Sequence, residues 1–301
     1  MSSTVSERFA RLRDEPMIPA GRPAGGTWGS VREVFQQRQL LDLLIRRDLK
    51  SRYKDSALGF AWTLIRPLVQ LGIYWLILGQ ILGSARAIPE FAIYIFAGLT
   101  LYGLFSEIVS GATGSVVANA GLLKKVYVPR EIYPLSAVGG ALFNFGIQLV
   151  ILLIATLAFR SFPTFENLMF FLPATLVILV WGTALGILLS ALNVYLRDMA
   201  YLVEVLMMLL MWASPIVYSW QMVFSRATDG PWEWVLPIYT NNPITLGILG
   251  FHRAFWTAGG PEQYPDHLML RMGIAILVGL VALFFCQRVF ARLQGNFAQE
   301  I

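Results

Sequence analysis

The chain has 301 residues, of which 56% are hydrophobic and 14% are charged, whereas a soluble globular domain carries about a quarter charged residues. This composition excludes an ordinary soluble enzyme, and it is too apolar for a disordered chain. One cysteine, Cys286, and two histidines, His252 and His267, exclude internal disulfides and multi-cysteine metal sites, so we expect no metal site. The composition is typical of a polytopic membrane protein.

The formal net charge of +5 does not indicate a nucleic-acid-binding protein. Twelve of the 23 Lys and Arg residues lie within residues 1–66, where they are mixed with acidic residues. No basic groove interleaved with aromatic residues follows, as single-stranded nucleic acid would require. Basic residues beside apolar runs usually report orientation in a bilayer. We therefore expect no nucleic-acid partner.

Six apolar runs are long enough to cross a bilayer as helices, which takes about 20 residues. They predict an all-α membrane protein with six transmembrane helices near residues 67–86, 91–112, 133–158, 168–191, 203–222 and 268–290. The uncharged segment Trp234–His252 carries Pro237, Asn241, Asn242 and Pro243 near its middle. Such breakers are tolerated at membrane depth only where protein or water satisfies the freed backbone. We predict that this segment forms re-entrant or interfacial outer helices before the last span.

The basic residues flank the predicted spans unevenly. With the N-terminus inside, 18 basic residues face the cytoplasm and five face outward. The positive-inside rule then places both termini in the cytoplasm, and the N-terminus is too polar for a cleavable signal peptide. We expect residues 1–30 to be a flexible tail, residues 31–60 an amphipathic interface helix region, and residues 61–301 the transmembrane domain.

Residues 37–58 precede the first span and have the pattern of a two-faced helix. The apolar face consists of Leu41, Leu44, Ile45, Leu49 and Tyr53. A second, basic face holds Arg46, Lys50 and Lys54. The spacing also predicts ion pairs between Asp42 and Arg46 and between Asp48 and Arg52. A basic helix with an apolar stripe typically lies in the plane of the membrane interface; a solvated helix packed on a neighbouring domain is the alternative.

The loop Gly121–Pro134, GLLKKVYVPREIYP, is too amphipathic for a tight turn. It suits a stub helix that docks into a groove of a partner protein, although a plain connector is the alternative. The sequence contains no G-x-x-x-x-G-K-[ST] phosphate loop. It also lacks recognisable hydrolase motifs, so we expect no catalytic residue and no ATP hydrolysis on this chain.

Glu107 is the one charged residue within the second apolar run. A carboxylate at membrane depth is a functional hypothesis by default because its burial is costly. The alternative is a structural hydrogen bond between helices. Most of the nine Trp residues fall near the outer ends of spans, where an aromatic belt accounts for them, while a minority are able to face a pore.

Six motifs occur in the order and spacing of a known family. They are RDLKSRY with the following LGFAW and Pro67, LLKKVYVPREIYPL, SALNVYLRD, SPIVYS, Asn242–Pro243, and the terminal NFAQEI. Over residues 36–300 the chain resembles the membrane subunits of ABC-2 type exporters for polysaccharides. These include the O-antigen, capsular and teichoic-acid permeases and the mycobacterial-type galactan permease.

The resemblance implies a homodimer of six-span chains paired with two copies of a separate nucleotide-binding ATPase subunit, which holds the Mg-ATP. The loop between the second and third spans is then a cytoplasmic coupling helix. The residues expected to dock the ATPase are Leu122, Lys124, Lys125, Pro129, Arg130 and Glu131. This chain itself is expected to bind no cofactor.

The resemblance also implies a substrate, a lipid-linked glycan that enters at the inner leaflet. Its pyrophosphate is attracted to the basic interface helix, where the candidate residues are Arg46, Arg47, Asp48, Arg52 and Tyr53. The glycan then threads through a channel at the dimer interface. The candidates for the translocation path are Tyr74, Trp75, Glu107 and Trp212.

Three other functions stay open at this point. One is export of a smaller lipid or a drug through the same ABC-2 architecture. A proton-coupled secondary transporter would need more buried charge than Glu107 and would work without an ATPase. A membrane-embedded glycosyltransferase would need a pair of acids in the outer loops, where no recognisable pair occurs.

Overall fold

The computed structural model describes residues 27–53, 61–81, 83, 88–123, 128–228 and 230–300. Within these ranges the chain is helical and contains no β-strand, which confirms the predicted all-α class. The elements are α2 (Thr27–Gln36), α3 (Arg38–Tyr53), α4 (Ala61–Tyr74), η1 (Trp75–Ile81), α6 (Phe91–Ala118), α7 (Ala120–Leu123), α8 (Ile132–Ala158), α9 (Phe165–Leu168), α10 (Phe171–Tyr195), α11 (Met199–Trp212), α12 (Trp220–Thr228), α13 (Val235–Thr240), α14 (Pro243–Phe255), η2 (Pro261–Gln263), α15 (Leu268–Leu293), η3 (Gln294–Asn296) and α16 (Phe297–Glu300).

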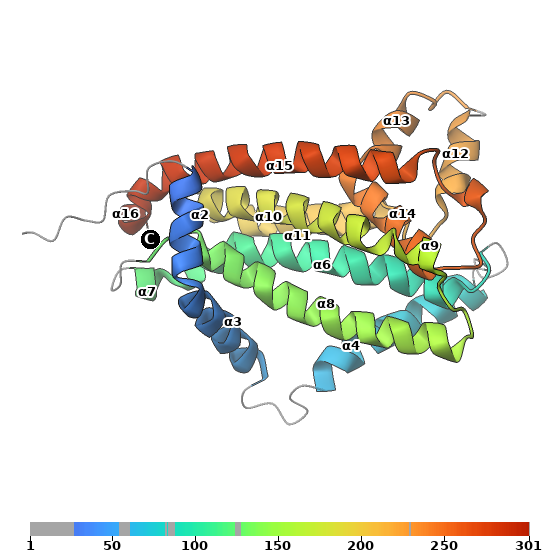
Figure 1. Cartoon of the computed structure of the whole chain (residues 1–301), viewed down its shortest axis with the longest axis horizontal. Coiled ribbons are helices and arrows are strands. Elements are labelled where there is room, and N and C mark those ends of the chain that lie inside the picture. The colour runs from blue at the N-terminus through green and yellow to red at the C-terminus, as the bar shows by residue number, and fades with distance from the viewer. Residues whose placement is uncertain are drawn as a thin grey trace, which may run out of the picture.

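Four long helices, α6, α8, α10 and α15, run side by side along the long axis of the molecule (Figure 1). The short helices gather at the two ends. At one end, called here the α3 end, lie α2, α3, α7 and α16 (Figure 1). At the opposite end, called the α12 end, lie α9, α12, α13 and α14 (Figure 1).

Five of the described helical segments are long and apolar enough to cross a bilayer. They are Ala61–Ile81, Phe91–Ala118, Ile132–Ala158, Phe165–Tyr195 and Pro261–Asn296. Each overlaps one of the predicted spans, since an unbroken apolar run of about 20 residues leaves the backbone few alternatives to a helix. The sequence therefore located these five segments correctly.

The predicted span at 203–222 is wrong as a continuous helix. The structure has instead the apolar helix α11, which ends at Trp212, and a second helix, α12, which begins at Trp220. Pro215 explains the break, because it has no backbone N–H to donate and disfavours helical geometry at the preceding Ser214. With 14 residues, α11 is about 21 Å long, shorter than the bilayer core of roughly 30 Å.

The N-terminal boundaries also differ from those predicted. Helix α2 begins at Thr27, so the tail expected over 1–30 loses its last four residues to a helix; residues 1–26 lie outside the described part. The amphipathic region contains two helices, α2 and α3, rather than one. The first span starts at Ala61, and Pro67 sits inside α4 rather than at its beginning.

The segment Trp234–His252 is broken where its sequence predicts. Helix α13 stops at Thr240, and α14 starts at Pro243, whose fixed φ suits the first helical position. The side chain of Asn242 caps α14 by accepting a hydrogen bond from the backbone N–H of Ile244, at 2.9 Å. Eleven residues of α14 are buried, because α14 packs against α6, α10 and α15.

Helix α6 is the centre of the bundle. Most of its residues are buried, and it contacts α4, α8, α10, α11 and α14. Its approach to α10 depends on glycine, since a Cβ added at Gly186 would lie 2.7 Å from the Cβ of Ala112. Gly186 therefore sets how closely the two helices pack.

Replacing Gly186 with leucine is expected to overpack the contact between α6 and α10 and to destabilise the protein by about 1–3 kcal/mol. Gly146 on α8 is the matched control, because it is exposed and nothing lies within 4 Å of a Cβ added there. Thermal unfolding of the detergent-purified protein measures both variants. Equal melting temperatures for Gly186→Leu and Gly146→Leu would contradict the packing argument.

Candidate functional site

A second hydrophobic core, separate from the main one, closes the α3 end of the molecule. It is built from residues of six elements and the turn before α8: Leu44, Val116, Val128, Ile132, Tyr133, Ile187, Ala191, Val194, Phe290 and Phe297. These residues come from positions far apart in the sequence. The second core therefore joins α3, the end of α6, the start of α8, and the ends of α10 and α15 into one block.

Helix α3 is held on this block by its predicted apolar face. Leu44 is only 3% exposed, and Ile45 packs on the backbone of α8 at Gly139, where an added Cβ would lie 2.3 Å from Ile45 Cδ1. The apolar stripe of α3 is thus covered by α8 rather than left open. The opposite side remains exposed, as shown by Leu43 at 62%.

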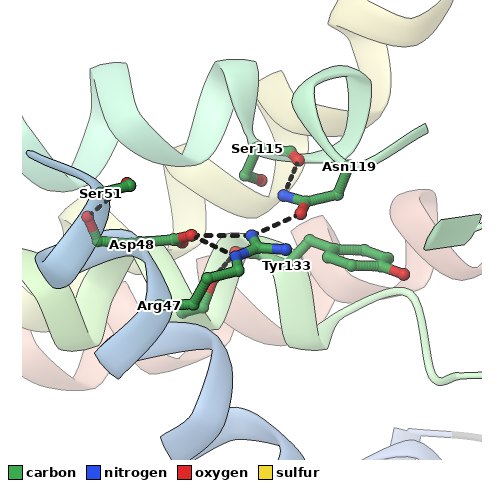
Figure 2. A network of polar contacts seen from close by, with 7 residues as sticks. Arg47, Asp48, Ser51, Ser115, Asn119 and Tyr133 are labelled. Carbon is green, nitrogen blue, oxygen red and sulfur yellow. Dashed lines mark hydrogen bonds and ion pairs between the residues drawn. The ribbon is translucent and has the colours of Figure 1, made fainter. Parts of the chain in front are cut away.

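Arg47 ties α3 to the end of α6 (Figure 2). Its Nη2 donates to Oδ1 of Asn119 at 2.6 Å and to Oδ1 of Asp48 at 2.7 Å. Asn119 in turn donates from Nδ2 to the carbonyl oxygen of Ser115, at 2.8 Å. Because Asn119 is the C-cap of α6, the guanidinium group reaches the point where this helix ends. Charge-assisted hydrogen bonds of this kind are the stronger ones.

The predicted coupling loop begins next to this contact. Its described part consists of the four-residue helix α7 and residues 128–131, while Lys124 and Lys125 lie outside the described residues. Leu122 is half-buried against the second core. We refer to residues 120–131 as the coupling segment.

The proline and two charges that close the coupling segment are in different environments. Pro129 is buried, and Glu131 is 5% exposed, with its Oε1 at 3.5 Å from Nε2 of Gln287 on α15. The guanidinium of Arg130 is partly exposed and lies 5.7 Å from the ring centre of Phe297, a cation–π contact. Arg130 is therefore partly accessible, whereas Pro129 and Glu131 are buried and anchor the segment.

Two sequence motifs brace the same block from α10 and α16. In SALNVYLRD, Asn193 donates from Nδ2 to the carbonyl oxygen of Thr113 on α6, at 3.1 Å. The hydroxyl of Tyr195 donates to the backbone carbonyl oxygen of Leu293 on α15, at 2.7 Å. In NFAQEI, Phe297 is fully buried and packs edge-to-face on Phe290, at 5.5 Å. Both motifs therefore have a structural role at the α3 end.

The remaining candidates on the interface helix are partly described. Arg46 forms the predicted ion pair with Asp42, at 2.8 Å, and both side chains are exposed. Asp48 contacts Arg47 at 2.7 Å. The predicted pair of Asp48 with Arg52 stays a prediction, because the side chains of Arg52 and Tyr53 lie outside the described part. Arg46 thus points away from the second core, whereas Arg47 points into the contact with α6.

The aromatic candidates for a translocation path do not share one site. Tyr74 is half-buried, with its hydroxyl 3.9 Å from the sulfur of Met211 on α11. Trp75 is 43% exposed and Trp212 is 51% exposed on the surface of the single chain. These two rings are available to lipid or to a second protein chain, and the structure brings neither of them onto Glu107.

Glu107 lies in a groove between helices. Its Oε1 accepts a hydrogen bond from Nδ2 of Asn144 on α8, at 2.5 Å, so the predicted hydrogen bond between helices is present. The groove is lined by parts of α4, α6 and α8 together with Met211 of α11. Among the described residues, no group of three or more His, Cys, Asp and Glu residues gathers to hold a metal.

Sequence reasoning missed Asn119 and Asn144, the partners of Arg47 and Glu107. A signal for Asn119 exists, since asparagine directly after a long apolar run is a common helix C-cap. Asn144 lies within an uncharged apolar run, and its carboxamide is itself the signal that could have identified it. Polar side chains in spans usually face other helices.

Comparison with known proteins gives a consistent result. A family profile described as ABC-2 type transporter matches residues 39–256. The chain is 29% identical over 272 residues to the O-antigen export system permease protein RfbA of Myxococcus xanthus, covering 90% of this chain and 98% of that protein. It is 25% identical over 273 residues to the protein of the same name from Klebsiella pneumoniae, covering 90% and 99%. It is also 22% identical over 183 residues to the polysialic acid transport protein KpsM of Escherichia coli, covering 60% and 70%.

Replacing Arg47 with alanine is expected to loosen α3 by about 1 kcal/mol, the net value of a typical hydrogen bond, because half of the Arg47 side chain is solvated. Hydrogen exchange of the α3 amides should speed up roughly fivefold. Arg46→Ala is the control, since it removes an exposed ion pair worth little. If both variants exchange at the wild-type rate, Arg47 does not hold α3.

Proposed function

Because this chain belongs to the ABC-2 type transporter family, we propose that it is the membrane permease of an ATP-driven exporter for a lipid-linked polysaccharide. The exporter moves its substrate from the cytoplasmic to the outer side of a bacterial plasma membrane. Support comes from relatives that align over nearly their full length and are named for O-antigen export. A glycan of the O-antigen, teichoic-acid or galactan type is the expected substrate.

The single observation that carries the proposal is the construction of the α3 end around the coupling segment. Here the coupling segment is attached to the end of α6 and to the start of α8, and Arg47 links it to α3 through Asn119. A displacement of this segment is therefore passed to several helices at once. A partner that changes shape with ATP and contacts Arg130 is placed to drive such a displacement.

ATP hydrolysis belongs to that partner, because the sequence of this chain has no phosphate-binding loop. We assign two copies of a nucleotide-binding subunit, each holding Mg-ATP, to two copies of this chain. Lys124 and Lys125 belong to the same docking surface by their place in the sequence. The buried Glu131 has the supporting role of fixing the segment to α15.

The α3 end faces the cytoplasm in this proposal, with both termini inside. The five long helices and the shorter α11 then make six membrane crossings. Helices α13 and α14 form the re-entrant outer part before the last crossing, and α2 and α3 lie at the inner interface, at a steep angle to the long helices (Figure 1). Arg46, exposed on α3, is positioned to attract the pyrophosphate of the lipid carrier.

A second copy of this chain is assigned to the faces of α4 and α11. No residue of α4 is buried in the single chain, and most of α11 is exposed as well, including Val205, Leu209 and Trp212. Patches of this kind mark contacts with lipid or protein. With the two copies paired across these faces, Tyr74 and Trp212 come to line the path between them.

Affinity purification of the tagged chain in mild detergent tests the proposal. The expected result is a stoichiometric ATP-binding subunit that hydrolyses ATP, and deletion of the chain should remove a glycan from the cell surface. A chain that purifies alone, under conditions that preserve other exporter complexes, together with a normal surface glycan in the deletion strain, would overturn the proposal.

Arg130→Glu is expected to leave the chain folded and to uncouple or detach the ATPase, because the substitution reverses the partly exposed charge of the coupling segment. The measurement is the amount of co-purified ATPase subunit and of glycan exported. Arg292→Glu is the matched control, since Arg292 is an exposed arginine at the same end of the molecule. Normal export by Arg130→Glu would show that the coupling segment is only a connector.

A further inference from the structure

The groove that contains Glu107 is large enough for a ligand. Its volume is about 940 Å³, at the upper end of the range of roughly 300–1,000 Å³ for ligand pockets. The lining comes from α4, α6 and α8, with one residue of α11. None of the coupling residues at the α3 end belongs to it.

Three helices each present a pair of polar residues to the groove. The pairs are Arg66 and Gln70 on α4, Ser106 and Ser110 on α6, and Asn144 and Gln148 on α8. Each pair is four residues apart, which places both members on one face of their helix. The polar lining is therefore a continuous feature of the three facing surfaces rather than a scatter of single residues.

In the proposed topology, with the ends of α6 and α8 at the α3 end taken as the inner edge of the membrane, this polar lining lies at mid-membrane depth. Glu107 precedes the last residue of α6 by eleven residues, and Asn144 follows the first residue of α8 by twelve. These separations correspond to about 16 Å and 18 Å along the helix axes. Both are close to half of the roughly 30 Å hydrocarbon thickness.

Several of these groups have no protein partner among the described residues. Oδ1 of Asn144 is buried without a hydrogen bond, although Nδ2 of the same side chain is bonded to Glu107. The side chains of Ser106, Ser110 and Gln148 likewise make no hydrogen bond to any described residue. Leaving such groups against hydrocarbon is costly, so acyl chains are poor occupants and a polar ligand is favoured.

The chemistry of the lining fits a saccharide. Serine hydroxyls and carboxamides both donate and accept hydrogen bonds, as sugar hydroxyls do, and the carboxylate of Glu107 accepts them. Trp62, Phe96 and Tyr102 add aromatic surface for the apolar faces of sugar rings. An anionic group fits less well, because Arg66 is the single cation among the described lining residues and Glu107 shares the groove with it.

From these observations we propose that the groove between α4, α6 and α8 is a saccharide-binding site within each subunit, at mid-membrane depth. It holds sugar residues of the exported glycan by hydrogen bonds to Ser106, Ser110, Asn144, Gln148 and Glu107. The site deepens the proposed function and rests on it. It is distinct from the exposed faces of α4 and α11, which are assigned above to a second copy.

A photo-crosslinking experiment in glycan-producing cells tests this site with the natural substrate. A benzophenone amino acid replaces Ser110 in the groove or, as the control, Ile154, which is 60% exposed on α8 outside the groove. After irradiation and purification, periodate oxidation and hydrazide labelling detect sugar attached to the polypeptide. The expected result is sugar on the Ser110 variant and only acyl chains on the Ile154 variant. Adducts without sugar at Ser110, in cells that export normally, would overturn the site.

A matched pair of substitutions provides a second test. Gln148→Met keeps the length of the side chain and removes the amide that is proposed to bond the sugar, so export should fall roughly three- to tenfold, the effect of losing about one hydrogen bond. Gln80→Met is the control, because Gln80 is exposed in η1 and lies outside the groove.

Equal export by the two variants, at equal amounts of protein in the membrane, would show that the groove does not hold the glycan. Failure of the broader function is recognised separately, by an unchanged surface glycan after deletion of the chain.

Discussion

Most residues of helix α6 are buried in protein, and this constraint shapes both ends of the molecule. A polar group buried in this way has no access to water or headgroups, so it needs a hydrogen-bond partner in the protein. At one end, Tyr94 donates from its hydroxyl to the carbonyl oxygens of Pro215 and Tyr218, at 3.0 and 2.8 Å. At the other end, Asn119 accepts a hydrogen bond from Arg47. The irregular turn after α11 and the coupling segment are therefore both attached to one central helix.

The close packing around α6 leaves one side open to chemistry. Toward α10, glycine removes the side chains that would separate the helices, as at Gly186. Toward α4 and α8, α6 instead carries Ser106, Glu107 and Ser110, and the helices enclose a groove rather than a packed seam. The same helix thus provides a rigid attachment on one face and a polar surface on the other.

Much of the fold was predictable because a long apolar segment in a membrane satisfies its backbone hydrogen bonds mainly by forming a helix. Five long helices fall where uninterrupted apolar runs predict them. The turn at Asn242 and Pro243 was predictable because a capping side chain and a proline at the helix start act within a few residues. The continuous helix predicted at 203–222 is wrong because the hydrophobicity of this run does not reveal the break at Pro215. A proline in an apolar run has a local meaning that an average over 20 residues conceals.

The candidate site was less predictable, since its contacts join residues far apart in the sequence. Arg47 and Asn119 are 72 positions apart, and nothing in either segment indicates the other. Glu131 is buried because α15 lies beside it. Asn144 contacts Glu107 only because α6 and α8 are rotated so that these two side chains face each other. The prediction of these segments as a site came from motif resemblance, because motifs carry long-range information that periodicity and charge do not.

The second core has a consequence for how the protein is made. Its members span the chain from Leu44 on α3 to Phe297 on α16, so α3 lacks part of its packing partner until α15 has been inserted. Contacts of such long sequence separation form late. During synthesis, the helices already in the membrane therefore leave the coupling segment without its final support. Under the proposed function, a half-synthesised chain therefore has no finished docking surface for an ATPase, and assembly follows only after the permease is complete.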